Sequence, residues 1–275
     1  MESLEDHIVH EGISPPIDSQ PHPARVYDCL LDGKDNYLAD QAVAEELSRR
    51  WPDIRKGVHE NRAWMHRVVR HLAAEAGMDQ FLDIGTGIPT SPNLHEVAQR
   101  AVPASRVVYV DNDPVVLSHA GALLKPLSSE GSTTYLEADL REPERILAAE
   151  QVRETLDMGR PVALMLVAIL HFLEDREDPD GIVRTLVDAL PSGSYVAISH
   201  ACGDEAPEDA AEAAAFYRER KVSAPVVPRG HARIEEFFTG LELIGPGVVP
   251  VGQWMPEIPG TGEPGVFHGG VARKA

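Results

Sequence analysis

Residues 81–96 read FLDIGTGIPTSPNLHE, and this stretch decides the fold. Its first four residues form a short apolar strand, and Gly85 and Gly87 then permit backbone conformations and a close ligand approach that a Cβ would block. Ser91 is expected to cap the following helix, with Pro92 at the first helical position. Strand, glycine turn and helix in this order are typical of an α/β sheet that presents a nucleotide-sized ligand at its carboxyl edge.

The second predicted strand ends in an acidic residue. Residues 106–110 (RVVYV) precede Asp111, whose carboxylate is placed to accept hydrogen bonds from both hydroxyls of a ribose. Pro114 then begins another helix, and Asp113 is expected to cap it.

The third predicted strand, residues 133–136, leads into Glu137-Ala138-Asp139-Leu140. The Asp139 carboxylate can accept a hydrogen bond from an adenine amino group. Leu140 and Ile88 are expected to cover the faces of the ring. Three successive strand ends therefore predict a nucleoside site, whereas a Gly-x-Gly alone would be weak evidence.

These motifs together resemble the signature of class I S-adenosylmethionine (SAM)-dependent methyltransferases, which reads D-x-G-x-G, then an acidic residue, then an A-D pair. More narrowly, the chain is similar to an actinobacterial family of S-adenosyl methyltransferases with undefined substrates, which carries ARVYDCLLDGKDNYLAD (24–40) and NRAW (61–64). The resemblance runs from Ala24 to the GGVARK segment (269–274). It implies SAM as the cofactor and a class I methyltransferase fold. The implied cofactor contacts are Asp83, Gly85, Thr86, Gly87, Asp111, Asn112, Ala138, Asp139 and Leu140.

A nicotinamide dinucleotide is the competing ligand. Its fold uses G-x-G-x-x-G, in which the third glycine lets the helix approach the strand. That position is Thr90 here, and Pro89 before it removes a backbone N–H that a pyrophosphate would use. SAM has no phosphate and is therefore favoured.

From residue 80 onward, strands and helices alternate, which predicts an α/β fold: a Rossmann-like parallel sheet with helices on both faces. Residues 241–254 and 266–272 are expected to form an antiparallel hairpin at the sheet edge, as the resembled family implies. We expect a mobile leader (1–22), an N-terminal helical cap (23–78) and a SAM-binding core (79–275). The five parallel strands are expected near 80–84, 106–110, 133–136, 162–168 and 194–199.

Residues 32–36 (DGKDN) make a poor helix centre and predict a turn between two cap helices, the second of which Asp40 is expected to cap. A lid turn over the methionine end of SAM would place Asn36 and Tyr37 against cofactor or substrate, with Tyr37 as a catalytic candidate. The alternative is an ordinary turn with Tyr37 packed in the core. Arg62 could pair with the SAM carboxylate through two hydrogen bonds or bind an acid on the cap surface.

His171 follows the fourth strand, at the place that faces the transferred methyl group in this fold. Its ordinary pKa suits a general base, which a hydroxyl or ammonium acceptor would need. The alternative is a histidine that bonds a loop carbonyl or only walls the pocket. His200, after the fifth strand, has the same two interpretations. Asp83 is expected to order the glycine loop or bind the SAM amino group.

The overall composition limits the classes of partner that we expect. The formal charge is −19 and the pI is near 5.0, which argues against broad contact with a nucleic-acid backbone. Seven basic residues of the N-terminal third are interpreted as a solvated helical face: Arg49, Arg50, Arg55, Lys56, Arg62, Arg67 and Arg70. The longest apolar run, residues 162–170, is shorter than the roughly 20 residues that span a bilayer. We expect a cytoplasmic protein with no membrane or nucleic-acid partner; the sequence leaves its oligomeric state open.

Two cysteines, Cys29 and Cys202, make no disulfide framework or metal pattern and are expected to be buried small residues in a reducing compartment. The sequence therefore favours a SAM-dependent methyltransferase that acts on a small-molecule acceptor and has no metal. A SAM-binding protein without catalysis, acting as a regulator or scaffold, is the second hypothesis, and a nicotinamide-dependent oxidoreductase is the third.

Overall fold

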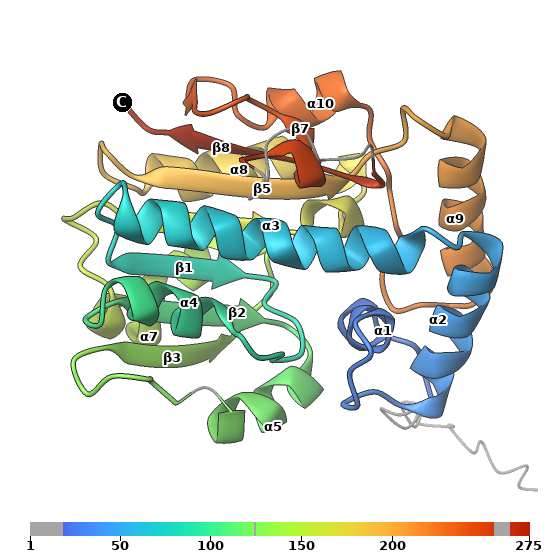
Figure 1. Cartoon of the computed structure of the whole chain (residues 1–275), viewed down its shortest axis with the longest axis horizontal. Coiled ribbons are helices and arrows are strands. Elements are labelled where there is room, and N and C mark those ends of the chain that lie inside the picture. Colours follow the sequence, from blue (N-terminus) through green and yellow to red (C-terminus); the bar gives the residue numbers. More distant parts are fainter. Residues whose placement is uncertain (1–18, 124, 256–264) are drawn as a thin grey trace, which may run out of the picture.

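The computed structural model describes residues 19–123, 125–255 and 265–275. In this part of the chain one eight-stranded sheet has the order β3-β2-β1-β4-β5-β8-β6, with β7 also paired to β8. The first five strands run parallel and β8 runs antiparallel to β5, which confirms the predicted sheet (Figure 1). The strands are β1 (Gln80–Ile84), β2 (Arg106–Asp111), β3 (Ser132–Glu137), β4 (Ala163–Val167), β5 (Tyr195–Ala201), β6 (Glu242–Leu243), β7 (Val249–Pro250) and β8 (Phe267–Arg273).

Helices cover both faces of this sheet. The α-helices are α1 (Pro23–Leu30), α2 (Leu38–Arg50), α3 (Ile54–Ala74), α4 (Leu94–Ala101), α5 (Pro114–Leu123), α6 (Pro143–Ala148), α7 (Glu150–Thr155), α8 (Pro179–Asp188), α9 (Pro207–Glu219) and α10 (His231–Glu236). Short 3₁₀ turns span Leu170–Phe172, Asp175–Glu177 and Val251–Gln253.

Alternate residues of each strand point into two separate cores. In β2, Val107 and Tyr109 join the core that contains buried residues of α1 to α4, whereas Val108 and Val110 join the core under α6, α7, α8 and α10. The strands are therefore apolar on successive residues because both faces of a parallel sheet are covered.

The cap helix α3 lies directly on the sheet and is not a separate layer above it (Figure 1). Trp64 of α3 is fully buried and meets Trp254 edge to face, with ring centroids 6.4 Å apart. An added Cβ at Gly269 of β8 would come within 2.9 Å of the Trp64 ring, so this glycine lets α3 approach the sheet.

Most of the predicted leader lies outside the described residues. Its last residues contact the rest of the protein: the Pro21 carbonyl accepts from Ser223 N at 2.9 Å, and His22 N donates to Asp40 Oδ1 at 2.9 Å. The chain therefore meets the cap and the α9–α10 connection before α1 begins.

Two predicted helix starts are wrong. The helix after β1 begins at Leu94 with Asn93 as its N-cap, not at Pro92 with Ser91. Glu96 explains the shift, because its Oε2 accepts from both Asn93 N (2.7 Å) and Ser91 Oγ (2.8 Å). The predicted cap of α5 is confirmed, since Asp113 Oδ1 accepts from Val115 N at 3.0 Å.

The second wrong start is α2, which begins at Leu38 after Tyr37 as its N-cap. Asp40, predicted as the cap, is three residues further along the chain. Its Oδ2 reaches back to accept from Tyr37 N at 2.9 Å, so the carboxylate still satisfies the helix start, but from within the first turn.

At the other end of the chain, the antiparallel pairing on β8 is confirmed, but residues 241–254 are not one strand. Within this segment, only Glu242–Leu243 and Val249–Pro250 pair with β8. A turn with Gly245 and Gly247 at positive φ separates the two. The Gly/Pro-rich connection between the two segments (255–265) falls almost entirely outside the described residues.

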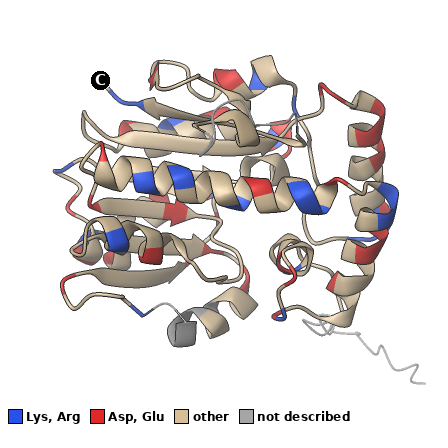
Figure 2. Cartoon of the chain, viewed as in Figure 1, with Lys and Arg blue, Asp and Glu red and all other residues tan. Residues whose placement is uncertain are grey.

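The basic residues predicted as a solvated helical face are only partly solvated. Figure 2 shows blue residues along α3 and acidic residues along α9. Arg67 of α3 donates to the Val251 carbonyl at 2.6 Å and to the Trp254 carbonyl at 3.2 Å. It therefore ties α3 to the C-terminal segment instead of facing a polyanion.

Cys29 and Cys202 are free thiols, each half-buried, and burial raises the pKa of both. Within the three described ranges, no helix has the length and apolar character to cross a membrane.

Candidate functional site

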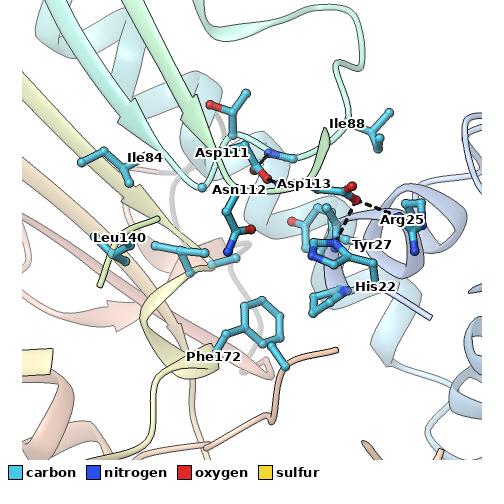
Figure 3. Close-up of a pocket in the computed structure, with 18 of the residues that line it drawn as sticks. His22, Arg25, Tyr27, Ile84, Ile88, Asp111, Asn112, Asp113, Leu140 and Phe172 are labelled. Carbon is cyan, nitrogen blue, oxygen red and sulfur yellow. Dashed lines mark hydrogen bonds and ion pairs between the residues drawn. The ribbon is translucent and has the colours of Figure 1, made fainter. Parts of the chain in front are cut away.

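A cavity of about 730 Å³ opens at the carboxyl ends of the parallel strands. Its floor comes from the residues that follow β1, β2, β3 and β4, and its other wall comes from α1, α3 and the connection after α9. Figure 3 shows residues from these separate elements pointing into one space, with Asn112 above Phe172 and the α1 residues to one side. The strand ends predicted as a nucleoside site thus converge.

The glycine loop after β1 is fixed by the neighbouring strand. Gly85 and Gly87 have φ of +78° and +67°, which a residue with a Cβ rarely adopts. Gly85 N and Thr86 N both donate to the Val110 carbonyl (2.8 and 3.2 Å). An added Cβ on Gly85 would also come within 2.6 Å of the Ile169 side chain, so this glycine is required by packing as well as by conformation.

Asp111 connects this loop to the end of β2. Its Oδ2 accepts from Gly87 N at 2.8 Å and its Oδ1 accepts from Asp113 N at 2.9 Å. Burial raises the pKa of Asp111 to about 6 despite these hydrogen bonds. The carboxylate is therefore held rigidly at the cavity wall, where the prediction places a ribose.

The predicted adenine end is assembled from the residues after β3. Ala138, Asp139 and Leu140 line the cavity together with Ile88. Asp139 Oδ2 accepts from Asn112 Nδ2 at 3.0 Å, which joins the ends of β2 and β3. Arg141 N donates to Asp139 Oδ1 at 2.9 Å, so the carboxylate is already oriented by its neighbours.

The carboxyl group of Asp83 has few partners in the cavity. Burial raises the pKa of its carboxyl to about 7, against the lowering effect of Arg62. Thr86 Oγ1 is a weak donor to it at 3.5 Å. In the described ranges, no Lys, Arg or His nitrogen lies within 4 Å of the Asp83 or Asp111 carboxylates. A ligand that brings positive charge would therefore be favoured here, and SAM carries both a sulfonium and an ammonium group.

Arg62 lines the cavity, but its guanidinium binds backbone carbonyls of the protein. Nη2 donates to the Thr90 carbonyl and, at 3.0 Å, to the Pro92 carbonyl. The side chain therefore holds the loop that follows the glycine turn, and the predicted pairing with the SAM carboxylate stays a prediction.

The turn between α1 and α2 is organised around Asp28. Asp28 Oδ2 accepts from Asn36 Nδ2 at 2.9 Å and from Asp35 N at 3.1 Å. Neither Asn36 nor Tyr37 is among the described residues that line the cavity. Tyr37 is 36% exposed, and its ring lies 5.3 Å from the Arg25 guanidinium carbon, so it is not packed in the core. A contact of Tyr37 with cofactor or substrate stays a prediction.

His171 and His200 lie behind the cavity wall. His171 Nδ1 accepts from Ala201 N at 3.3 Å, and burial lowers the pKa of His171 well below its ordinary value. Burial likewise lowers the pKa of His200 to about 3, and its Nδ1 donates to the Ala201 carbonyl at 2.8 Å. Phe172, next to His171, is the residue that faces the cavity (Figure 3). Neither histidine is among the described residues that line the cavity, and a catalytic role for either stays a prediction.

His22 and Arg25 are among the cavity residues that the sequence analysis missed. Arg25 is buried between carboxylates, with Nε 3.0 Å from Asp40 Oδ2 and Nη1 3.0 Å from Asp113 Oδ2. His22 Nδ1 lies 3.1 Å from the same oxygen of Asp113. Residue 22 was assigned to the leader because it has no periodic neighbours, but a polar residue before Pro23 is the usual pattern at a helix start and could have indicated it.

Comparison with known proteins agrees with this site. The family model described as S-adenosyl methyltransferase matches residues 11–275. A DUF574 family protein from Streptomyces avermitilis is 50% identical, with a TM-score of 0.89 over 94% of this chain and 100% of that chain. A protein from Thermobifida fusca, assigned provisionally as a methyltransferase, is 40% identical, with a TM-score of 0.86 over 96% of this chain and 99% of that chain.

At lower similarity, an O-methyltransferase family protein from Burkholderia thailandensis is 15% identical, with a TM-score of 0.50 over 83% of this chain and 62% of that chain, and shows the fold alone. No curated protein matches the sequence. The cavity at the strand ends and the match over residues 11–275 lead to one conclusion: the chain belongs to the S-adenosyl methyltransferase family, and SAM is its cofactor.

Proposed function

We propose that the protein transfers the methyl group of SAM to a small-molecule acceptor that binds on the cap side of the cavity. The carrying observation is that one cavity joins the strand ends to the cap. Leu31, Met65 and Phe172 line it in addition to the residues predicted to hold the nucleoside. An apolar compartment next to a cofactor site is the usual setting for a small organic ligand.

The roof over this compartment supports a small acceptor. Ser223 N donates to the Pro21 carbonyl at 2.9 Å, and Arg25 Nη2 donates to the Gln20 carbonyl at 2.8 Å. Gln20, Ser223 and Ala224 all line the cavity. The residues before α1 and those of the α9–α10 connection thus meet over the cavity, which favours a small acceptor over a polymer.

Bound SAM supplies a methyl group already activated by the sulfonium. The protein then has to align the acceptor with the S–CH₃ bond and exclude water. The glycine loop and Asp111 orient the nucleoside, and Asp83 and Asp111 supply negative charge near the cationic cofactor. The cap holds the acceptor, and its roof excludes water.

The test begins with thermal unfolding in the presence of SAM, S-adenosylhomocysteine, NADH or NADPH. A ligand at 100 times its Kd stabilises the folded state by about 2.7 kcal/mol. We expect a rise in Tm with the first two ligands and none with the nicotinamides. Methyl-labelled SAM is then incubated with small-molecule and macromolecular fractions of a cell extract, and label is expected in the small-molecule fraction. Label in the macromolecular fraction would contradict the proposal, and binding without transfer to either would support the non-catalytic alternative.

A further inference from the structure

Arg62 reaches from the cap helix α3 to the loop that follows the glycine turn. Its Nη2 donates to the carbonyl of Thr90 and, at 3.0 Å, to the carbonyl of Pro92. Both Arg62 and Thr90 are partly buried and line the cavity. One cap residue therefore bridges the loop on its way from the glycine turn to α4.

The loop held in this way shapes the predicted nucleoside site. Ile88, which is expected to cover one face of the adenine ring, directly follows Gly87 and is 5% exposed. It packs against Val115 and Val116 of α5, so the loop is fixed to α5 on one side and to α3 on the other. Movement of the loop would therefore displace the residue predicted to cover the ring.

A second residue of α3 binds the same loop without charge. His66 Nε2 lies 2.9 Å from the Pro92 carbonyl. Burial lowers the pKa of His66 to about 4, and the charge of Arg62 contributes to this lowering. His66 is therefore neutral at pH 6 and above, and of the two residues Arg62 supplies the positive charge.

In the described part of the chain, the guanidinium of Arg62 has no carboxylate at contact distance, and its hydrogen bonds go to neutral carbonyls. Its charge still acts on carboxyls further away, because a partly buried site screens charge less than water does. Burial raises the pKa of Asp83 in β1 to about 7, and Arg62 is the strongest influence that opposes this rise. Arg62 thus favours the ionised form of a carboxyl that lines the same cavity.

Titratable groups of four elements interact electrostatically with Arg62: Tyr27 of α1, Asp83 of β1, Tyr109 of β2 and Glu96 of α4. Burial raises the pKa of both tyrosines, so neither is charged near neutral pH. Burial would also raise the pKa of Glu96, but hydrogen bonds from the loop lower it, so this carboxylate is ionised. Asp111 of β2 also acts on Asp83, and burial raises the pKa of Asp111 to about 6. Of these neighbours of Arg62, Asp83 is therefore the one whose charge changes between pH 6 and 8.

We propose that Arg62 is a positioning residue for cofactor binding: it holds the loop after the glycine turn against α3, and its positive charge prepares the Asp83 carboxyl to receive the cationic part of SAM. The inference goes beyond the proposed function, because it concerns the cofactor and holds for any acceptor. It differs from the predicted pairing of Arg62 with the SAM carboxylate, in which the guanidinium contacts the cofactor itself. The two roles predict different pH dependences of SAM binding.

Without the charge of Arg62, the free protein keeps a proton on Asp83 up to a higher pH. A cationic ligand has to displace that proton, so SAM binding weakens most where Asp83 is protonated. An opposite charge nearby lowers the pKa of a carboxyl by about 1–3, and we expect about 1 here because the two groups are not in contact. Since the pKa of Asp83 starts at about 7, loss of the charge should raise the Kd about tenfold at pH 6 and about twofold at pH 8. Loss of a direct contact with the SAM carboxylate would raise the Kd equally at both.

The experiment measures the Kd of SAM by calorimetry at pH 6, 7 and 8 with the full chain. Arg62→Gln removes the charge, Arg62→Lys keeps it, and His66→Phe removes only the uncharged donor to the Pro92 carbonyl. The matched control is Arg49→Gln, which removes the same charge from a side chain that is 74% exposed and is not among the described lining residues. Hydrogen exchange of the amides of residues 88–93, measured by mass spectrometry, reports on the loop in the same variants.

We expect the ratio of the Kd at pH 6 to the Kd at pH 8 to be about fivefold larger in Arg62→Gln than in wild type. Arg62→Lys, His66→Phe and Arg49→Gln should keep the wild-type ratio, because each leaves the charge near Asp83 in place. In an Asp83→Asn background, Arg62→Gln should not change the ratio. The loop amides should exchange about tenfold faster in Arg62→Gln, because the shorter side chain cannot hold both carbonyls, and at the wild-type rate in Arg49→Gln.

A rise in the Kd of Arg62→Gln that is equal at pH 6 and pH 8 would overturn the inference, since it would show a direct contact with the cofactor. A changed ratio that persists in the Asp83→Asn background would overturn the part assigned to Asp83. Wild-type exchange of the loop amides in Arg62→Gln would overturn the holding of the loop. If Arg62→Gln does not fold, Arg62→Lys carries the test: we expect faster loop exchange at the wild-type Kd ratio, and a larger ratio or wild-type exchange would overturn the inference.

Discussion

Arg25 and Asp113 form a buried ion pair at 3.0 Å that joins the first helix of the cap to the N-terminus of α5. Both side chains are almost fully buried, and Asp40 of α2 completes the network at 3.0 Å from Arg25. The cap is therefore attached to the cofactor half of the sheet through buried charges.

Removing this guanidinium should destabilise the whole protein. Arg25→Met leaves two buried carboxylates without their cation, and breaking a buried ion pair typically costs about 3–5 kcal/mol. Chemical denaturation should show this loss. Arg49→Met is the control, since Arg49 is 74% exposed and pairs with Glu46 only at 3.5 Å, and a change above about 1 kcal/mol there would be unexpected. Equal stability of Arg25→Met and wild type would contradict the network.

Gly33 makes room for the Asp28 carboxylate. A Cβ added at Gly33 would lie 2.0 Å from Asp28 Oδ1, so Gly33→Ala should destabilise the turn by about 1–3 kcal/mol. In an Asp28→Ala background the same glycine substitution should cost much less, because the clash is gone. A double-mutant cycle measures this coupling, and additive effects would refute the packing explanation.

The affinity for SAM should depend on the charge of Asp111. Asp111→Asn keeps an oxygen that can accept from a backbone N–H but removes the negative charge, and a charged hydrogen bond is worth about 1.5–3 kcal/mol. We expect calorimetry to show at least a tenfold rise in Kd. Glu137→Gln at the exposed end of β3 is the control and should leave Kd unchanged. A variant Asp111→Asn with wild-type affinity would remove Asp111 from the cofactor site.

SAM binding should weaken as the pH falls. Burial raises the pKa of Asp83 to about 7 and that of Asp111 to about 6, so the free protein holds protons on these groups at pH 5. A cationic ligand favours the ionised forms, so binding releases protons below pH 7, and Kd rises by up to about tenfold per pH unit for each group. Calorimetry in two buffers at pH 6.5 counts the protons. Asp83→Asn should flatten the dependence between pH 6 and 8, and proton uptake on binding would contradict the assignment.

His171 and Tyr37, the catalytic candidates of the sequence analysis, can each be tested by substitution. Tyr37→Phe should leave kcat/KM and SAM affinity within about twofold of wild type, because the hydroxyl lies away from the described cavity wall. His171→Gln should lower Tm more than it lowers turnover, because the buried ring packs against Phe172 and His200. A large loss of kcat/KM at unchanged Tm in either variant would restore its catalytic role.

The sheet and the strand-end residues could be predicted because their signals are local. Each parallel strand is a short apolar run, and the residue after it lies at the carboxyl edge whichever helix follows. Asp111, Ala138 and Leu140 line the cavity for this reason. The starts of α2 and α4 were missed because Asp40 and Glu96 bind the N-cap backbone from inside the first turn of the helix. The same residue types can also stand at the N-cap itself, so the composition of the segment does not distinguish the two positions.

The contacts of His22 and Arg25 could not be predicted from local pattern at all. Arg25 meets Asp113 across 88 residues, and nothing in the sequence around either residue indicates the other. The same limit applies to His171, whose position after β4 predicts proximity to the methyl group. Its rotation away from the cavity depends on Ala201 of a different strand.

The burial of Trp64 against Trp254 and Gly269 has a consequence for how this family diversifies. Helix α3 belongs to the cap in sequence but packs on the sheet. Replacing the whole cap with that of a relative would therefore disrupt the core. We expect recombinants joined near residue 78 to misfold unless the last strand is exchanged too. New acceptor preferences would then arise by single substitutions in α1 and in the connection after α9, while the packing of α3 on the sheet stays unchanged.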